Sequence, residues 1–174
     1  MPQTLDIESF DPLAWVNAYT QTAIHGAVVE PILHFSLMWN LFERDACGKE
    51  ATRTKIGAIV SSAASAGLLS LEPFAEHLTF FQDRAQREGM EIKQYLNALK
   101  MENAKDRHLV HEVLDDRTNE PKKVVHALLL IAHRVRNNLF HGEKEVAYLH
   151  AQVSLFRAVN SLIATYLTVT KSAA

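Results

Sequence analysis

Three polar residues close together in the sequence have the types and spacing for acid–base chemistry on a phosphodiester. They are Arg136, Asn137 and His141, and they stand just before Gly142. Asn137 and His141 are four residues apart, so on a helix the amide can hold the imidazole in place. Arg136 supplies a permanent cation whose planar fork of donors suits phosphate. In the last turn of a helix the dipole favours the imidazolium form, so we expect His141 to move a proton.

A helix over residues 122–141 is predicted to position these groups. Its apolar residues recur on one stripe that should face the core, namely Val124, Leu128, Ile131, Val135 and Leu139. The opposite face gathers polar residues within about 80° of one another, namely His126, His133, Asn137 and His141. An ordinary amphipathic helix divides in the same way, so the residue types carry the prediction and the periodicity does not. Gly142 would end the helix and leave the imidazole uncovered.

The run from Arg134 to Lys144, RVRNNLFHGEK, resembles the Arg-polar-x3-His signature of HEPN domains. An aliphatic helix before the motif and a long helix after it agree with this resemblance over residues 120–174. The rest of the chain matches only as a helical bundle of suitable size. Arg and His at this spacing occur by chance, but their place at a helix end, with Asn after Arg and Gly after His, makes the match more specific.

The resemblance implies a metal-independent endoribonuclease that acts as a homodimer, with two motif helices lining one cleft. His141 would then be the general acid or base at the ribose 2′-OH or the leaving oxygen. Arg136 would stabilise charge on the phosphoryl group, and Asn137 would orient His141 or the phosphate. Such cleavage needs RNA, leaves a 2′,3′-cyclic phosphate and requires no cofactor. Defence, toxin and RNA-processing roles are common in the family, so an antitoxin or regulatory protein is a further expected partner.

One position departs from the family pattern, and two other interpretations stay open. HEPN toxins that pair with a nucleotidyltransferase antitoxin carry a Tyr two residues after the His, where this chain has Glu143. The first alternative is a catalytically inactive HEPN-type module that binds RNA, a nucleotide or a protein partner. The second is a structural oligomer in which Arg136 pairs with a carboxylate.

Several other residues are candidates for supporting roles. Glu43 could reach Arg136 if the second helix packs beside the motif helix, although a solvated glutamate is the more ordinary interpretation. Two residues on the motif helix could assist in the same site, namely His133 and Arg134. A basic surface for RNA phosphates could include further cations, namely Lys122, Lys123 and Lys144.

A metal site is not favoured by the sequence. His108 and His111 could share a helical face, with Glu112 beside them, but no second pair stands at ligand spacing. Surface histidines on an amphipathic helix explain them better. The single Cys47 cannot form an internal disulfide, which fits a reducing compartment.

Composition and periodicity predict one all-α domain over residues 1–174, of cytoplasmic location. The chain has 174 residues, 48% hydrophobic and 22% charged, with a net charge of −2, which disfavours unselective coating of nucleic acid. No signal peptide or membrane-spanning run is evident. Periodicity predicts a helical bundle, and the resemblance to HEPN domains implies that it is a HEPN-like up-down bundle with additional helices. Helices are predicted over residues 13–22, 31–48, 51–69, 72–88, 92–101, 105–116, 122–141 and 143–170.

Overall fold

The computed structural model describes residue 8 and residues 10–140 and 146–171, with the backbone alone at 140 and 146–148. All regular structure in these ranges is helical, which confirms the all-α class. The α-helices are α1 (Pro12–Thr20), α2 (Gly26–Asp45), α3 (Arg53–Ser65), α4 (Ala75–Ala85), α5 (Ile92–Ala98), α6 (Ala104–Leu114), α7 (Pro121–Phe140) and α8 (Val153–Lys171). Three 3₁₀ turns join them: η1 (Glu72–Phe74), η2 (Arg87–Gly89) and η3 (Val146–Gln152).

The start of α2 differs from the prediction. The sequence pattern places Pro31 in the first turn, but α2 begins at Gly26 and contains Pro31. Pro31 is buried, and its carbonyl accepts a hydrogen bond from Nδ2 of Asn160 in α8 at 3.0 Å. Tertiary packing therefore holds a proline inside the helix in spite of its missing N–H donor. After the helix, Gly48 adopts the expected left-handed conformation at φ 64°.

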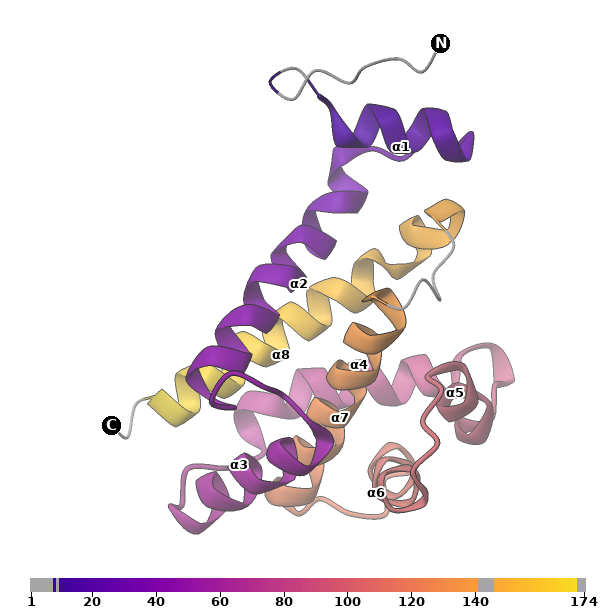
Figure 1. Cartoon of the computed structure of the whole chain (residues 1–174). Coiled ribbons are helices and arrows are strands. Elements are labelled where there is room, and N and C mark those ends of the chain that lie inside the picture. Colours follow the sequence, from indigo (N-terminus) through magenta and orange to yellow (C-terminus); the bar gives the residue numbers. More distant parts are fainter. Residues whose placement is uncertain (1–7, 9, 141–145, 172–174) are drawn as a thin grey trace.

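The two long helices α2 and α8 lie side by side and run in the same direction (Figure 1). Aromatic pairs join them along their length, with ring centroids of Phe35 and Phe156 5.5 Å apart and those of Phe42 and Tyr166 5.9 Å apart. The predicted last helix is partly wrong, because residues 146–152 form the 3₁₀ turn η3 and α8 begins only at Val153. The predicted start at Glu143 lies outside the described residues.

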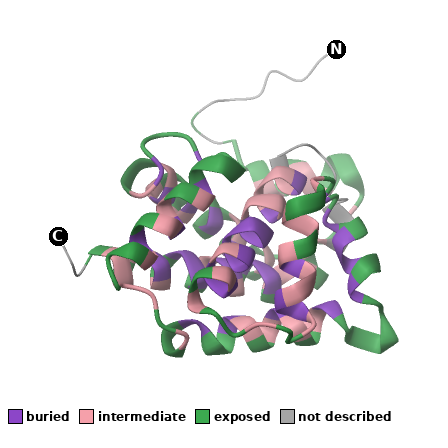
Figure 2. Cartoon of the chain, turned by 90° about the horizontal axis from the view of Figure 1, so that it is seen from below, coloured by how far each residue is buried: buried purple, intermediate pink, exposed green. Residues whose placement is uncertain are grey.

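Helix α7 runs through the middle of the molecule, with α3 and α6 as its main neighbours and α4 and α8 also in contact (Figure 1). The predicted core stripe is confirmed from Val124 to Val135, and Leu139 is partly buried against it. Burial extends well beyond that stripe, to Val125, Ala127, Leu129, Leu130 and Ala132. Buried segments gather inside the bundle and exposed ones outside, as Figure 2 shows.

One stretch, Leu149–Lys171, is long and apolar enough to pass a test for a membrane span. A core helix passes the same test. The stretch consists mainly of α8, whose buried side chains pack into the bundle, among them Leu155, Phe156, Val159, Leu162 and Ile163. This packing buries about 33% of the apolar window of the stretch.

Candidate functional site

The first two motif residues lie in the last turn of α7. Both are half-buried, and Nη1 of Arg136 donates to Oδ1 of Asn137 at 3.4 Å. The amide oxygen is thus directed to the neighbouring guanidinium. His141 and Lys144 lie outside the described residues, so the contact between Asn137 and His141 stays a prediction.

Arg136 lines a pocket of about 340 Å³ between the end of α2, the start of α3 and α7. The pocket is lined by Glu43, Glu50, Ala51, Thr52, Arg53, His133 and Arg136. Glu43 at the end of α2 thus lines the same pocket as Arg136, and its predicted supporting role stays a prediction. Oε1 of Glu43 also accepts a long hydrogen bond, 3.4 Å, from the backbone N–H of Ala51, so the carboxylate helps to hold the loop before α3.

His133 lies on the wall of this pocket and is held in an uncharged form. Its ring centroid is 6.1 Å from that of the buried Trp39. Burial, followed by the nearby cations Arg134 and Arg136, lowers the pKa of His133 to about 4, although Asp106 and Glu43 oppose this shift. At neutral pH His133 is therefore a neutral imidazole, which can accept a hydrogen bond or a proton but adds no positive charge.

Helix α3 crosses the face of α7 that was predicted to be polar. A Cβ atom at Gly57 would lie 3.3 Å from the ring of His126, so the two helices approach closely only because this residue is glycine. Burial lowers the pKa of His126 as well. The polar face is therefore covered at His126, and its opening lies nearer the Arg136 end.

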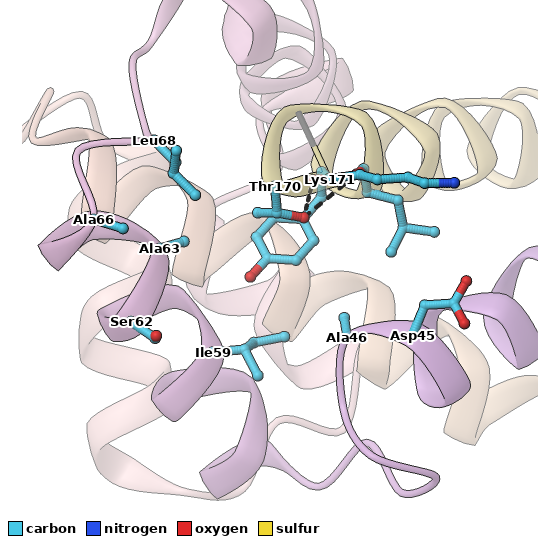
Figure 3. A pocket seen from close by; sticks show the side chains of 11 residues that line it. Asp45, Ala46, Ile59, Ser62, Ala63, Ala66, Leu68, Thr170 and Lys171 are labelled. Atoms are coloured by element: carbon cyan, nitrogen blue, oxygen red, sulfur yellow. Dashed lines mark hydrogen bonds between the residues drawn. The ribbon is translucent and has the colours of Figure 1, made fainter. Parts of the chain in front are cut away.

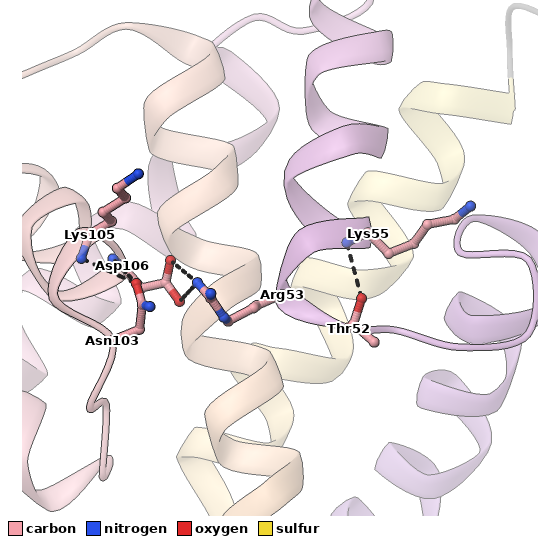
Figure 4. Close-up of polar contacts among 6 residues, drawn as sticks. All are labelled: Thr52, Arg53, Lys55, Asn103, Lys105 and Asp106. Carbon is pink, nitrogen blue, oxygen red and sulfur yellow. Dashed lines mark hydrogen bonds and ion pairs between the residues drawn. The ribbon is translucent and has the colours of Figure 1, made fainter.

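The beginnings of α3 and α6 meet beside the pocket (Figure 4). Nη1 of Arg53 forms an ion pair with Asp106, 3.2 Å from Oδ2, and Arg53 lines both the Arg136 pocket and a smaller hollow of about 110 Å³ beside Arg134. Thr52 caps α3 by accepting from the N–H of Lys55, and Asn103 caps α6 by accepting from Lys105 and Asp106. Sequence reasoning missed Arg53, because no local pattern connects it with a motif on another helix.

Arg134 and Asn138 attach α7 to the end of α5. Both donate to the carbonyl of Leu99, Nε of Arg134 at 2.9 Å and Nδ2 of Asn138 at 3.2 Å. Oδ1 of Asn138 in turn accepts from Nη2 of Arg134 at 3.4 Å. Arg134, predicted as a supporting residue, thus holds α7 against the end of α5. Asn138, for which the sequence suggested no chemistry, is buried and shares it.

The two lysines predicted to extend the RNA surface are far from Arg136. Lys122 is exposed in the first turn of α7, about 20 Å along the helix axis from Arg136. Lys123 beside it forms an ion pair with Glu112, with Nζ 2.9 Å from Oε1. An RNA strand would have to follow the length of α7 to contact both ends.

A histidine metal site and a pocket at the ends of α2 and α8 are two further candidates for a ligand site. Among the residues that the structure describes, no group of three His, Cys, Asp or Glu could hold a metal ion, His108 and His111 included. A pocket of about 600 Å³ lies where α2 and α8 end against α3 (Figure 3). Its walls are mainly small and aliphatic, and its charged members are Asp45 and Lys171.

No family model, curated protein or solved structure matches this chain. The chemistry of its own residues therefore has to support any assignment of function. Among the described residues, the candidate site consists of a half-buried Arg136 next to Asn137, a neutral His133 and a nearby Glu43.

Proposed function

We propose that this protein is a metal-independent endoribonuclease of the HEPN type, with a HEPN-like up-down bundle extended by additional helices. The observation that carries the proposal is the place of Arg136 and Asn137. They lie in the last turn of the central helix, and Arg136 lines a pocket with His133 and Glu43. A guanidinium in a hollow partly shielded from water interacts more strongly with a developing phosphoryl charge than one on an open surface.

The roles follow from the chemistry of the side chains. Arg136 stabilises the charge that develops on the phosphoryl oxygens, and His141 moves the proton at the 2′-OH or at the leaving oxygen. Asn137 positions the guanidinium it contacts or, in the assembled site, the imidazole. Neutral His133 keeps an acceptor at the pocket wall without adding charge.

The active form is a homodimer, because one chain supplies a single set of Arg136, Asn137 and His141. Two sets facing each other across a shared cleft would bind RNA on either side of the scissile bond. RNA is the expected substrate, and the need for a 2′-OH excludes DNA. A defence or toxin role, with an antitoxin or regulatory partner in the cytoplasm, stays a prediction from the family resemblance.

The test is RNA cleavage by the purified protein in excess EDTA, with structured and single-stranded substrates. We expect cleavage by the wild type and its loss in Arg136→Ala and His141→Ala. Matched controls are Arg157→Ala and His34→Ala, which change exposed residues of the same types on α8 and α2. Both controls should cleave as the wild type does.

Equal activity in the wild type and in both motif variants would contradict the proposal, because it would indicate a contaminating nuclease or another site. RNA binding without any cleavage, unchanged in His141→Ala, would instead favour the inactive binding module. A loss of cleavage on adding EDTA would contradict the metal-independent mechanism.

A further inference from the structure

A second cleft, on the other side of the Leu99 contact, contains arginines and an unpartnered phenol. It has a volume of about 400 Å³ and lies between the end of α4, η2, α5 and the junction of η3 with α8. Its lining is Arg84, Arg87, Glu88, Met90, Tyr95, Ala98, Leu99, Ala151, Gln152 and Leu155. This volume is within the range of pockets that bind small molecules.

Arg84 is a half-buried cation in this cleft without a carboxylate partner among the described residues. Its one hydrogen bond there goes from Nη2 to Oε1 of Gln152, at 3.2 Å, and a guanidinium has five N–H donors. Burial, with Arg87 nearby, lowers the pKa of Arg84. A cation that is taken partly out of water normally has a counter-charge, so this one is suited to an anion from outside.

Tyr95 supplies the second, independent sign of a ligand. It is only 7% exposed, and its hydroxyl is buried with no hydrogen-bond partner. Most buried polar groups in proteins are satisfied, so an orphaned hydroxyl on a residue that lines a cleft needs an explanation. Burial raises the pKa of Tyr95 to about 12, so the hydroxyl keeps its proton and can donate to an anion.

At the exposed mouth of the cleft, Arg87 is weakly paired with Glu88, the one acidic residue in the lining. Nε of Arg87 is 3.6 Å from Oε1 of Glu88, and the side chains are 72% and 84% exposed. Such a surface pair is screened by water and contributes little. Arg87 can therefore turn toward a bound anion at small cost, while Glu88 remains solvated.

The rest of the lining is apolar. Met90, Leu99 and Leu155 join two alanines and the ring of Tyr95, and none of them carries charge. Leu99 and Leu155 are already buried, but Met90 is 40% exposed, and an inorganic anion alone would leave it uncovered. A ligand with a charged end and a flat or apolar body fits the combination better.

We propose that this cleft binds a small phosphate monoester with a planar or apolar organic part, of the nucleoside monophosphate kind. The phosphate lies between Arg84 and Arg87 and accepts from the Tyr95 hydroxyl, while the organic part covers the exposed side chain of Met90. A bidentate contact from a guanidinium is the strongest that a phosphate makes with a side chain.

Two residues on the wall of this cleft, Leu99 and Gln152, connect it to the proposed catalytic residues. Leu99 on its wall accepts from Arg134 and Asn138, the residues that flank Arg136 and Asn137. Gln152 ends the 3₁₀ turn η3, which follows the segment that contains His141. A bound ligand would therefore change RNA cleavage, and this consequence alone rests on the proposed function.

The test is isothermal titration calorimetry of the full chain with three probes: inorganic phosphate, adenosine 5′-monophosphate and a short single-stranded RNA. We expect the mononucleotide to bind with a Kd below about 1 mM, and inorganic phosphate to bind more weakly. Arg84→Gln should weaken the mononucleotide at least about tenfold, and Tyr95→Phe by a smaller factor. Arg157→Gln is the matched control and should not change binding.

Arg87→Ala guards against a folding artefact, because Arg87 is exposed and its loss should weaken binding without lowering Tm. The proposal would be overturned if neither inorganic phosphate nor the mononucleotide binds. It would also be overturned if Arg84→Gln and the wild type bind the mononucleotide with equal affinity. If RNA alone binds, the free ligand is overturned: a loss of RNA affinity in Arg84→Gln would assign the cleft to the substrate backbone, and an unchanged affinity would place the RNA at another site. All these readouts are independent of cleavage, so they stand whether or not the protein is a nuclease.

Discussion

The two arginine-lined hollows of this protein differ in their countercharges. The two arginines of one pocket, Arg136 and Arg53, face two glutamates, Glu43 and Glu50. The two arginines of the other, Arg84 and Arg87, have only the solvated Glu88 at the mouth of their cleft. One hollow is internally balanced, and the other has excess positive charge.

This difference in charge distinguishes an arginine that stabilises a transition state from one that binds a ligand. A balanced pocket binds a resting anion weakly but can favour a transition state in which negative charge grows, which is what catalysis needs. A hollow with excess positive charge binds the anion in its ground state, which is what a ligand site needs. The Arg136 pocket therefore suits reaction, and the Arg84 cleft suits binding.

The largest expected effect is on cleavage by Arg136→Lys. This change keeps the charge but removes the planar fork, so we expect the single-turnover rate to fall about 10²- to 10³-fold. Arg84→Lys is the matched control and should keep a rate close to wild type in the absence of small ligands. Equal losses in the two variants would remove the distinction between a reacting and a binding arginine.

The second effect concerns the acid stability of the Arg136 pocket. The folded pKa of His133, about 4, is below the ordinary value of 6.5, so the unfolded chain binds more protons between these pH values. The contribution of neutral His133 to the free energy of unfolding is fully present above pH 6.5. It is lost as the pH falls toward 4, by up to about 3 kcal/mol.

His133→Asn should therefore flatten the fall in unfolding free energy between pH 6.5 and 4, measured by urea denaturation. Some slope will remain, because burial also lowers the pKa of His77 and His126. Exposed His34→Asn should not alter the slope. If His133→Asn also leaves the slope unchanged, His133 is not held neutral by its surroundings.

A smaller effect is expected where α7 is attached to Leu99, a residue that lines the Arg84 cleft. Asn138→Leu removes a buried donor from the Leu99 carbonyl and an acceptor from Arg134, so we expect a loss of about 1–3 kcal/mol in unfolding free energy. Exposed Asn40→Leu on α2 is the control and should change stability by less than about 0.5 kcal/mol. A neutral Asn138→Leu would show that α5 and α7 are not connected through this contact.

The smallest effect is the stability change in Arg84→Met. Removing a half-buried cation that has no carboxylate partner in the described part of the chain also removes its desolvation cost, so Tm should stay level or rise slightly. Differential scanning calorimetry without ligand measures this directly. A fall in Tm of many degrees would show that Arg84 is a structural residue and would weaken the case for a ligand site.

The sequence predicted the helical class and most helices because apolar periodicity and caps are local. Asp11 before Pro12 caps α1 as expected, and Gly48 follows α2 in a left-handed turn. The start of α2 was predicted wrongly, because burial of Pro31 against α8 outweighs the local signal.

The candidate site was only partly predictable for the same reason. Arg136 and Asn137 are recognisable because they are neighbours within one motif. Arg53 and Asn138 gain their roles from Asp106 and Leu99, and these contacts between distant segments leave no periodic trace in the chain. The neutral state of His133 likewise depends on burial beside Trp39.

The most direct test of the ribonuclease assignment is cleavage of an RNA that carries a single 2′-deoxy nucleotide at a mapped cleavage site, in EDTA. We expect this one substitution to block cleavage at that position alone and the unmodified RNA to yield a 2′,3′-cyclic phosphate. Undiminished cleavage at the 2′-deoxy position would contradict the ribonuclease assignment, because the reaction would then not use the 2′-OH.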